Sequence, residues 1–100
     1  MDNYKKFDTK AIHAGEEKDN PENALNSPIF MTSTFTFDNL DHAQRTFSFE
    51  TDDYVYTRGN NPTLRKFEKK MAALEEGTDG VAFASGMAAI TSTLLSVAKP

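Results

Sequence analysis

Apolar side chains recur at helical spacing in the stretch that follows Thr63. The apolar positions are Leu64, Phe67, Met71 and Leu74. Most charged residues of this stretch fall off that stripe, so the pattern predicts an amphipathic helix. Thr63 is its expected N-cap, and Gly77 is its expected end because glycine commonly terminates helices.

A second helix is predicted near the end of the chain, after a short uncharged segment. Residues 80–84 read GVAFA, which has the length and low polarity of a parallel strand covered on both faces. Residues 87–98 then carry apolar side chains three or four apart, at Met87, Ile90, Leu94 and Val97. Helix, strand, turn and helix in this order are typical of an α/β layer, so we expect the α/β fold class.

The first third of the chain lacks such a pattern. Gly15, Pro21 and Pro28 interrupt polar stretches, and little periodicity is visible among the first 35 or so residues. A segment this long without regular structure normally packs on something outside itself. We therefore expect residues 1–37 to form an extended N-terminal arm and residues 38–100 to begin an α/β domain.

One more helix is predicted between the arm and the amphipathic helix. Residues 38–49 carry apolar side chains three and four apart, and Asp38 can cap the first turn. Residues 52–58 are then expected to form a loop or a short extended segment. The sequence GNNPT at residues 59–63 predicts a tight turn before the next helix.

Composition and charge narrow the possible functions. The chain has 100 residues, of which 38% are hydrophobic and 26% charged, as in an ordinary globular protein. A net charge of -4 leaves no basic stripe for nucleic acid. The absence of cysteine excludes a disulfide, a thiolate metal site and a thiol nucleophile, and it fits a reducing cytosol. We therefore expect a cytoplasmic location and no nucleic-acid partner.

A membrane segment is not expected either. The uncharged run from Gly80 to Ala98 is long, but serine, threonine and glycine dilute its apolar character below that of a spanning helix. The first ten residues are charged and no apolar stretch follows them, so they do not resemble a secretory signal.

The Ser85–Gly86 pair sits where the predicted strand gives way to the predicted helix. Unpaired N–H groups at a helix start can bind an anion, and no acidic side chain lies nearby in the sequence. The simpler interpretation is that Ser85 only caps the helix and Gly86 only turns the chain. On these residues alone the simpler interpretation is favoured.

Five segments together resemble the pyridoxal-phosphate (PLP)-dependent enzymes of cysteine and methionine metabolism. They are TKAIHAG at 9–15, PIFMTSTFTF at 28–37, YVYTRGNNPT at 54–63, KMAALEEG at 70–77 and FASGMAAI at 83–90. They follow the order and spacing of the N-terminal quarter of that family. The resemblance implies the N-terminal part of a fold-type I PLP-dependent transferase, made of an extended arm and the start of a mostly parallel-sheet PLP-binding domain.

The resemblance also implies which residues bind the cofactor. Ser85, Gly86 and Met87 would cradle the PLP phosphate at the helix start, and Tyr56 and Arg58 would bind the phosphate of the neighbouring subunit's PLP. A guanidinium clamps an anion with two parallel hydrogen bonds, and a phenol adds a neutral donor. Without the resemblance, a surface ion pair is the favoured interpretation of Arg58.

Three other residues were weighed. Asn60 stands where most members of the family have glycine, and we expect asparagine to keep the turn because it tolerates left-handed backbone. His13 is interpreted as a structural residue of the arm, and His42 as a solvated residue. No metal-binding residue is assigned. No catalytic residue is assigned either, because the resemblance implies that the cofactor-linking lysine would lie beyond Pro100, so the chain resembles the front of a larger enzyme.

The predicted activity is elimination or replacement at the β- or γ-carbon of sulfur-containing or O-acylated amino acids. Methionine γ-lyase, cystathionine γ-synthase or lyase, and O-acetylhomoserine sulfhydrylase are the types that the resemblance implies. It further implies a small amino-acid substrate and a homotetramer built from catalytic dimers. The alternative is a non-catalytic interaction module whose aromatic-rich arm binds a partner. A phosphate-loop nucleotide binder is disfavoured because its glycine-lysine motif is absent.

Overall fold

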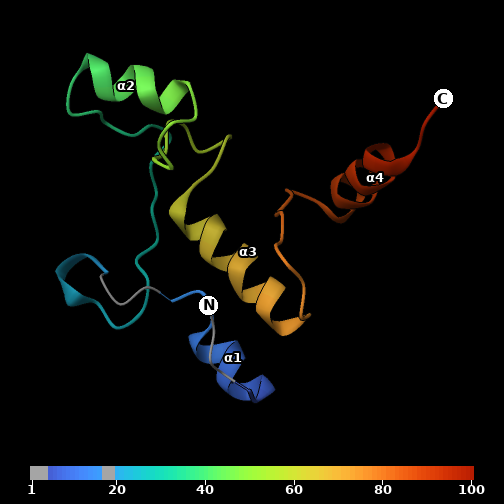
Figure 1. Ribbon diagram of the computed structural model, residues 1–100. Coiled ribbons are helices and arrows are strands. Elements are labelled where there is room, and N and C mark those ends of the chain that lie inside the picture. The colour runs from blue at the N-terminus through green and yellow to red at the C-terminus, as the bar shows by residue number, and fades with distance from the viewer. Residues whose placement is uncertain (1–4, 17–19) are drawn as a thin grey trace.

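The computed structural model describes residues 5–16 and 20–100. Its helices are α1 (Phe7–His13), the 3-10 turn η1 (Pro21–Asn23), α2 (Leu40–Phe47), α3 (Pro62–Leu74) and α4 (Gly86–Val97). Long connecting segments join them, and α1 packs against α3 while α2 and α4 stand apart from each other (Figure 1).

The predicted strand is absent from the described residues. Residues 80–84 have no strand partner there; instead the N–H of Ala82 donates to Glu68 Oε2 of α3 at 2.7 Å. The β pairing in the described ranges is a single antiparallel bridge between Thr34 and Tyr56. Because a strand needs neighbours to be stable, an apolar segment that meets only a helix stays irregular. The α/β class is therefore not established by this structure.

The sequence predicts an extended arm, but the described part of the arm is not wholly extended. Residues Phe7–His13 form helix α1, and the positive φ of Gly15, +80°, turns the chain behind it. Gly15 lies against α3 so closely that a Cβ there would sit 2.8 Å from the carbonyl oxygen of Lys66. Packing on α3 thus supports a helix that the local pattern does not reveal.

Two of the predicted helix caps are wrong by one or two residues. Asn61, not Thr63, caps α3, because its Oδ1 accepts the N–H of Thr63 at 2.8 Å and Pro62 occupies the first helical position. Asn39, not Asp38, caps α2, with its Oδ1 accepting the N–H of His42 at 2.8 Å.

The helix ends also differ from those expected. Helix α2 stops at Phe47, and Phe49 already has a left-handed backbone with φ 59°. Helix α3 stops at Leu74, where Glu76 takes the left-handed position and the N–H of Gly77 donates to the carbonyl of Ala72 at 2.8 Å. This is the Schellman arrangement, with a glutamate where glycine is usual.

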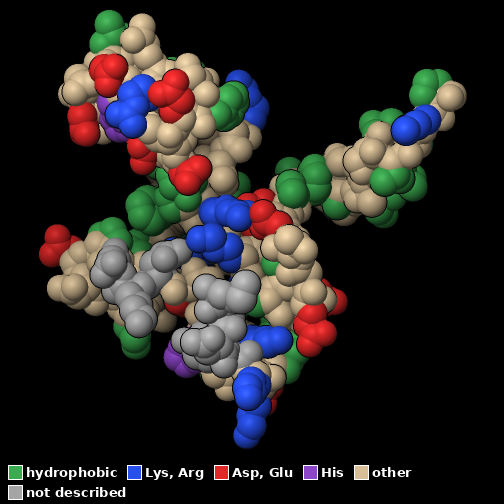
Figure 2. All heavy atoms as spheres, in the orientation of Figure 1, with side chains coloured by type: hydrophobic (Ala, Val, Ile, Leu, Met, Phe, Trp, Pro, Cys, Tyr) green, Lys and Arg blue, Asp and Glu red, His purple; other side chains and the backbone are tan. Residues whose placement is uncertain are grey.

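The described residues enclose almost no apolar core. Ala14 is the buried apolar residue among them, and the other buried residues are Asn20, Thr46 and Asn61. Hydrophobic side chains are exposed along α4, which projects from the rest of the molecule (Figure 2). None of the helices within the described ranges is both long and apolar enough to cross a bilayer.

Candidate phosphate-binding surfaces

The first surface is the corner loop, residues 55–61, which pairs with the arm. The N–H of Phe35 donates to the carbonyl of Val55 at 3.2 Å, and the N–H of Thr57 donates to the carbonyl of Ser33 at 2.8 Å. These two bonds flank the antiparallel bridge at Tyr56. The arm therefore holds the backbone of the corner loop from one side.

A tight turn closes the corner loop. The N–H groups of Gly59 and Asn60 both donate to the carbonyl of Tyr56, at 2.9 and 3.1 Å. Asn60 Oδ1 accepts the N–H of Asn61 at 2.9 Å, and Asn60 itself does not have a positive φ. The predicted turn is therefore present. Asn60 does not adopt the left-handed backbone on which that prediction was based; its side chain instead accepts a hydrogen bond within the turn.

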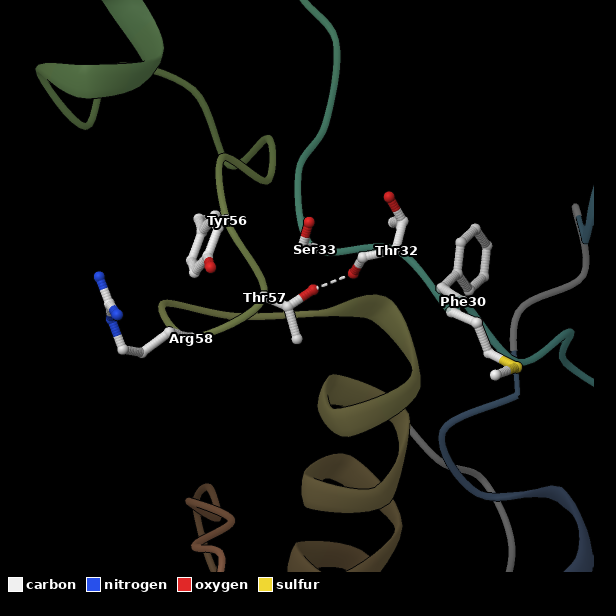
Figure 3. A pocket seen from close by; sticks show the side chains of 7 residues that line it. Phe30, Thr32, Ser33, Tyr56, Thr57 and Arg58 are labelled. Atoms are coloured by element: carbon white, nitrogen blue, oxygen red, sulfur yellow. Dashed lines mark hydrogen bonds between the residues drawn. The ribbon is translucent and has the colours of Figure 1, made fainter.

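Tyr56 and Arg58 lie together on this loop. The guanidinium carbon of Arg58 is 5.1 Å from the ring centroid of Tyr56, a cation–π arrangement. Both side chains point to the same side, and Thr57 between them points the other way, toward Thr32 (Figure 3). The loop and residues 30–33 of the arm line an open hollow of about 550 Å³.

The donors of this pair are not used inside the described part of the chain. Within residues 5–16 and 20–100, the Arg58 guanidinium has no ion-pair or hydrogen-bond partner, and neither has the Tyr56 hydroxyl. The surface ion pair considered for Arg58 is therefore not found there. A permanent cation and a neutral O–H donor that lie side by side suit a small polyanion such as a phosphate ester.

The second surface is the N-terminus of α4, a helix of 12 residues. Ser85 caps it, since Ser85 Oγ accepts the N–H of Ala88 at 3.1 Å. The N–H groups of Gly86 and Met87 make no hydrogen bond within the described ranges, and the first turn carries no acidic residue. A Cβ on Gly86 would meet nothing within 4 Å. The surface thus offers free donors, a positive helix end and open space.

The structure does not bring the two surfaces together. The hollow beside Tyr56 and Arg58 is lined by residues 30–33 and 56–58, and Ser85–Met87 take no part in it. The corner loop and α4 are also well separated in Figure 1. Each predicted set of residues is assembled locally, but one chain does not combine them into a single site.

His42 was expected to be solvated, and this is wrong. Its Nε2 lies 2.8 Å from Asp53 Oδ2, and its Nδ1 accepts the N–H of Asp38 at 3.1 Å. The hydrogen bond from His42 lowers the pKa of Asp53 below its usual value. His42 thus connects the first turn of α2 to the loop that follows the helix. No group of three potential metal ligands occurs among the described residues.

Sequence reasoning missed two residues of the first surface. Asn61 was interpreted only as part of a turn and Thr57 only as part of a loop or extended segment, yet both connect the corner loop to the arm. An asparagine directly before a proline at a helix start is a recognisable cap pattern. That signal could have identified the cap of α3, but not the contacts with the arm.

Comparison with known proteins identifies the family. The model of the family "Cys/Met metabolism PLP-dependent enzyme" matches residues 8–100. An L-methionine gamma-lyase of Fusobacterium nucleatum is 52% identical over 91 residues, or 91% of this chain and 23% of the relative. An O-acetyl-L-homoserine sulfhydrylase of Corynebacterium glutamicum is 42% identical over 92% of this chain and 21% of its own length.

Solved structures agree with the sequence matches. A putative O-acetylhomoserine (thiol)-lyase of Campylobacter jejuni, solved with a pyridoxyl-lysine monophosphate, superposes with a TM-score of 0.86 and 30% identity. The match covers 95% of this chain and 23% of that structure. The chain therefore spans less than a quarter of the length of these relatives. The resemblance, the PLP-dependent chemistry of the family and its enzymatic character are confirmed, which disfavours the non-catalytic module.

Proposed function

The chain belongs to the Cys/Met metabolism PLP-dependent enzyme family, and from this we propose that it supplies the cofactor-phosphate and dimer contacts of such an enzyme. The reaction would be elimination or replacement at the β- or γ-carbon of a sulfur-containing or O-acylated amino acid. The observation that carries the proposal is the Tyr56–Arg58 pair, whose side chains lie beside each other, line one hollow and have no hydrogen-bond or ion-pair partner among the described residues.

When bound, PLP withdraws electrons from the substrate's α-carbon, so that a group on the β- or γ-carbon can leave or be exchanged. The residues of this chain would hold that cofactor rather than move protons. Arg58 would neutralise the phosphate through charge-assisted hydrogen bonds, and Tyr56 would donate its O–H to the same group. The cation–π contact with Tyr56 keeps the guanidinium beside the phenol.

The start of α4 would hold a phosphate in a different way. The N–H groups of Gly86 and Met87 point out of the helix end, and the missing side chain of Gly86 lets the anion approach the backbone. Ser85 Oγ accepts from Ala88, which leaves its own hydrogen to donate to the phosphate.

Because the two surfaces are separate in one chain, we assign them to two different cofactors. Ser85–Met87 would serve the cofactor of their own subunit, and Tyr56 with Arg58 would serve that of the neighbour. Residues 1–37 would then be the arm and residues 38–100 the start of the PLP-binding domain. A homotetramer of catalytic dimers in the cytoplasm completes the proposal.

Mixing two inactive variants of the complete enzyme tests this assignment. Arg58→Ala would spoil the neighbour's site, whereas a variant that lacks the PLP-linking lysine would spoil only its own. After subunit exchange, half of the dimers are mixed and each has one intact site. With two-fold symmetry, an equimolar mixture should regain about a quarter of normal activity.

The control is the same mixture kept from exchanging subunits, which should stay inactive. If exchange is demonstrated by mass-tagged subunits and no activity returns, Arg58 acts within its own chain or does not hold the cofactor. Separately, an Arg58→Ala enzyme that binds PLP as tightly as the parent would contradict the phosphate role itself.

A further inference from the structure

Asn61 is almost completely buried, with 3% of its surface exposed, although it lies beside an open hollow. We propose that Asn61 is a positioning residue that holds Tyr56 and Arg58 in the geometry needed to bind a phosphate ester. The inference rests on the proposed function, because it presupposes that Arg58 is a phosphate ligand. It adds a residue that touches no ligand and acts through Thr57.

The Asn61 amide joins the arm, the corner loop and α3. Its Nδ2 donates to the carbonyl of Phe30 in the arm at 3.0 Å and to Thr57 Oγ1 in the corner loop at 3.1 Å. Its Oδ1 accepts the N–H of Thr63 in α3 at 2.8 Å. Capping a helix needs only the last of these bonds. The two bonds that Nδ2 donates connect α3 to the arm and to the corner loop, which capping does not require.

Thr57 connects Asn61 to the Tyr56–Arg58 pair, because it lies between these two residues in the chain. Its hydroxyl donates to the carbonyl of Thr32, so its oxygen is free to accept from Asn61. Its N–H donates to the carbonyl of Ser33 at 2.8 Å. The hydroxyl, the amide and the arm thus form one directional hydrogen-bonded chain, in which each donor has a fixed acceptor.

The position of Thr57 in the turn explains why fixing it orients its neighbours. Thr57 and Arg58 are the central residues of the turn that the N–H groups of Gly59 and Asn60 close on the Tyr56 carbonyl, so holding Thr57 fixes the backbone on both sides of it. Figure 3 shows this arrangement, with Thr57 turned toward Thr32 and the Tyr56 and Arg58 side chains on the other side. If Thr57 were released, anion binding would have to order the loop, and that cost would weaken affinity.

The test compares PLP with pyridoxal, which has the same ring but no phosphate. Asn61→Ser keeps a neutral N-cap oxygen and removes both Nδ2 donors. In the complete apoenzyme, it should raise the Kd for PLP about tenfold, or ~1.4 kcal/mol, by absorbance titration. The Kd for pyridoxal should stay within about twofold of the parent, because only the phosphate contacts are disturbed.

Asn39→Ser is the matched control. Asn39 caps α2 through the same kind of bond, 2.8 Å to the N–H of His42, and its amide nitrogen has no hydrogen bond in the described part of the chain. Exchanging it for serine should change neither Kd. Thr57→Val is the second variant: it should reproduce the PLP defect, and combining it with Asn61→Ser should add less than about twofold because both act on one chain of bonds.

Two results would overturn the inference. If Asn61→Ser raises the Kd of pyridoxal as much as that of PLP, Asn61 only maintains the fold, and if it changes neither, Asn61 does not position the pair. Arg58→Ala distinguishes these from a failure of the proposed function. If Arg58→Ala leaves the ratio of the Kd for PLP to the Kd for pyridoxal unchanged, Arg58 is not a phosphate ligand. The inference about Asn61 then fails together with the proposed function.

Discussion

The corner loop and the start of α4 both present free donors to an anion, but this chain supports them very differently. The corner loop is held by the arm and by the buried Asn61 amide. The side-chain hydrogen bonds of α4 stay within the helix, as from Ser96 to Thr93 and from Thr93 to Ala89. Its apolar side chains are exposed, with Met87 at 68% and Leu95 at 72%.

The difference indicates which surface is organised in advance. A loop whose backbone is already held by hydrogen bonds loses little entropy when a ligand binds. Helix α4 is locally well capped, but its apolar sides need a cover that the described residues do not provide. We therefore expect substitutions at α4 to act through the cofactor, and substitutions beneath the corner loop to act also on the fold.

The largest expected effect follows from side-chain bulk at Gly86. Apart from its chain neighbours and the adjacent backbone of α4, no heavy atom of the described chain lies within 4 Å of the Cβ position, so a larger residue there should collide mainly with the bound phosphate. Gly86→Val should raise the Kd for PLP about a hundredfold, whereas Ser85→Ala, which removes the cap of α4 and one hydrogen bond to a charged group, should raise it about tenfold. Titration of the complete apoenzyme measures both.

The thermal stability of the apoenzyme provides the control for these variants. Gly86→Val should melt at the parent's temperature in the absence of PLP. Equal PLP affinity in the valine variant and the parent would mean that Gly86 is only a turn residue, and the contrast between the two surfaces would disappear.

A smaller effect is expected at Gly15, where the surroundings are the opposite of those at Gly86. Gly15 has φ +80°, and a Cβ would lie 2.8 Å from the Lys66 carbonyl oxygen. Gly15→Ala should therefore destabilise the apoenzyme by about 1–3 kcal/mol through backbone strain and the forced separation of arm and α3. Urea unfolding without cofactor is the measurement.

Gly77→Ala is the matched control, because its Cβ would make ordinary contacts, the shortest being 3.7 Å. It should change stability by less than about 0.5 kcal/mol. If the two variants prove equally stable, the close packing of the arm on α3 does not contribute to the fold.

The smallest effect concerns acid and the contact between the arm and α3. Hydrogen bonds from Ser27 lower the pKa of Glu16 below its usual value of 4.5, and Lys70 and Lys66 add to this. A lowered pKa in the folded state means that the contribution to stability is complete above pH 4.5 and is lost as the pH falls through the folded pKa. We expect a loss of about 1 kcal/mol or less between pH 6 and pH 3.

Ser27→Ala checks the assignment, since it removes the largest cause of the lowered pKa. The variant should show a shallower decrease of unfolding free energy over the same pH range. An identical pH dependence of the unfolding free energy in the variant and the parent would mean that Glu16 is not the titrating group.

The sequence alone determined the features that depend on neighbours three or four residues apart. The apolar stripes predicted α3 and α4, and a serine ahead of the second stripe predicted its cap, all of which the structure contains. The phosphate-binding roles of Tyr56 and Arg58 remain predictions from a family resemblance, and the donor chemistry of their side chains could be read from residue type. Helical spacing and capping are local, so a sequence reports them directly.

Tertiary structure alone decided the contacts between distant segments. Helix α1 forms where Gly15 brings the arm onto α3, and Asn61 reaches back 31 positions to Phe30. The apolar segment 80–84 stays irregular because it meets α3 rather than another strand. A strand, a docked helix and a buried amide each depend on contacts with segments that are distant in the sequence. Local periodicity does not reveal such contacts.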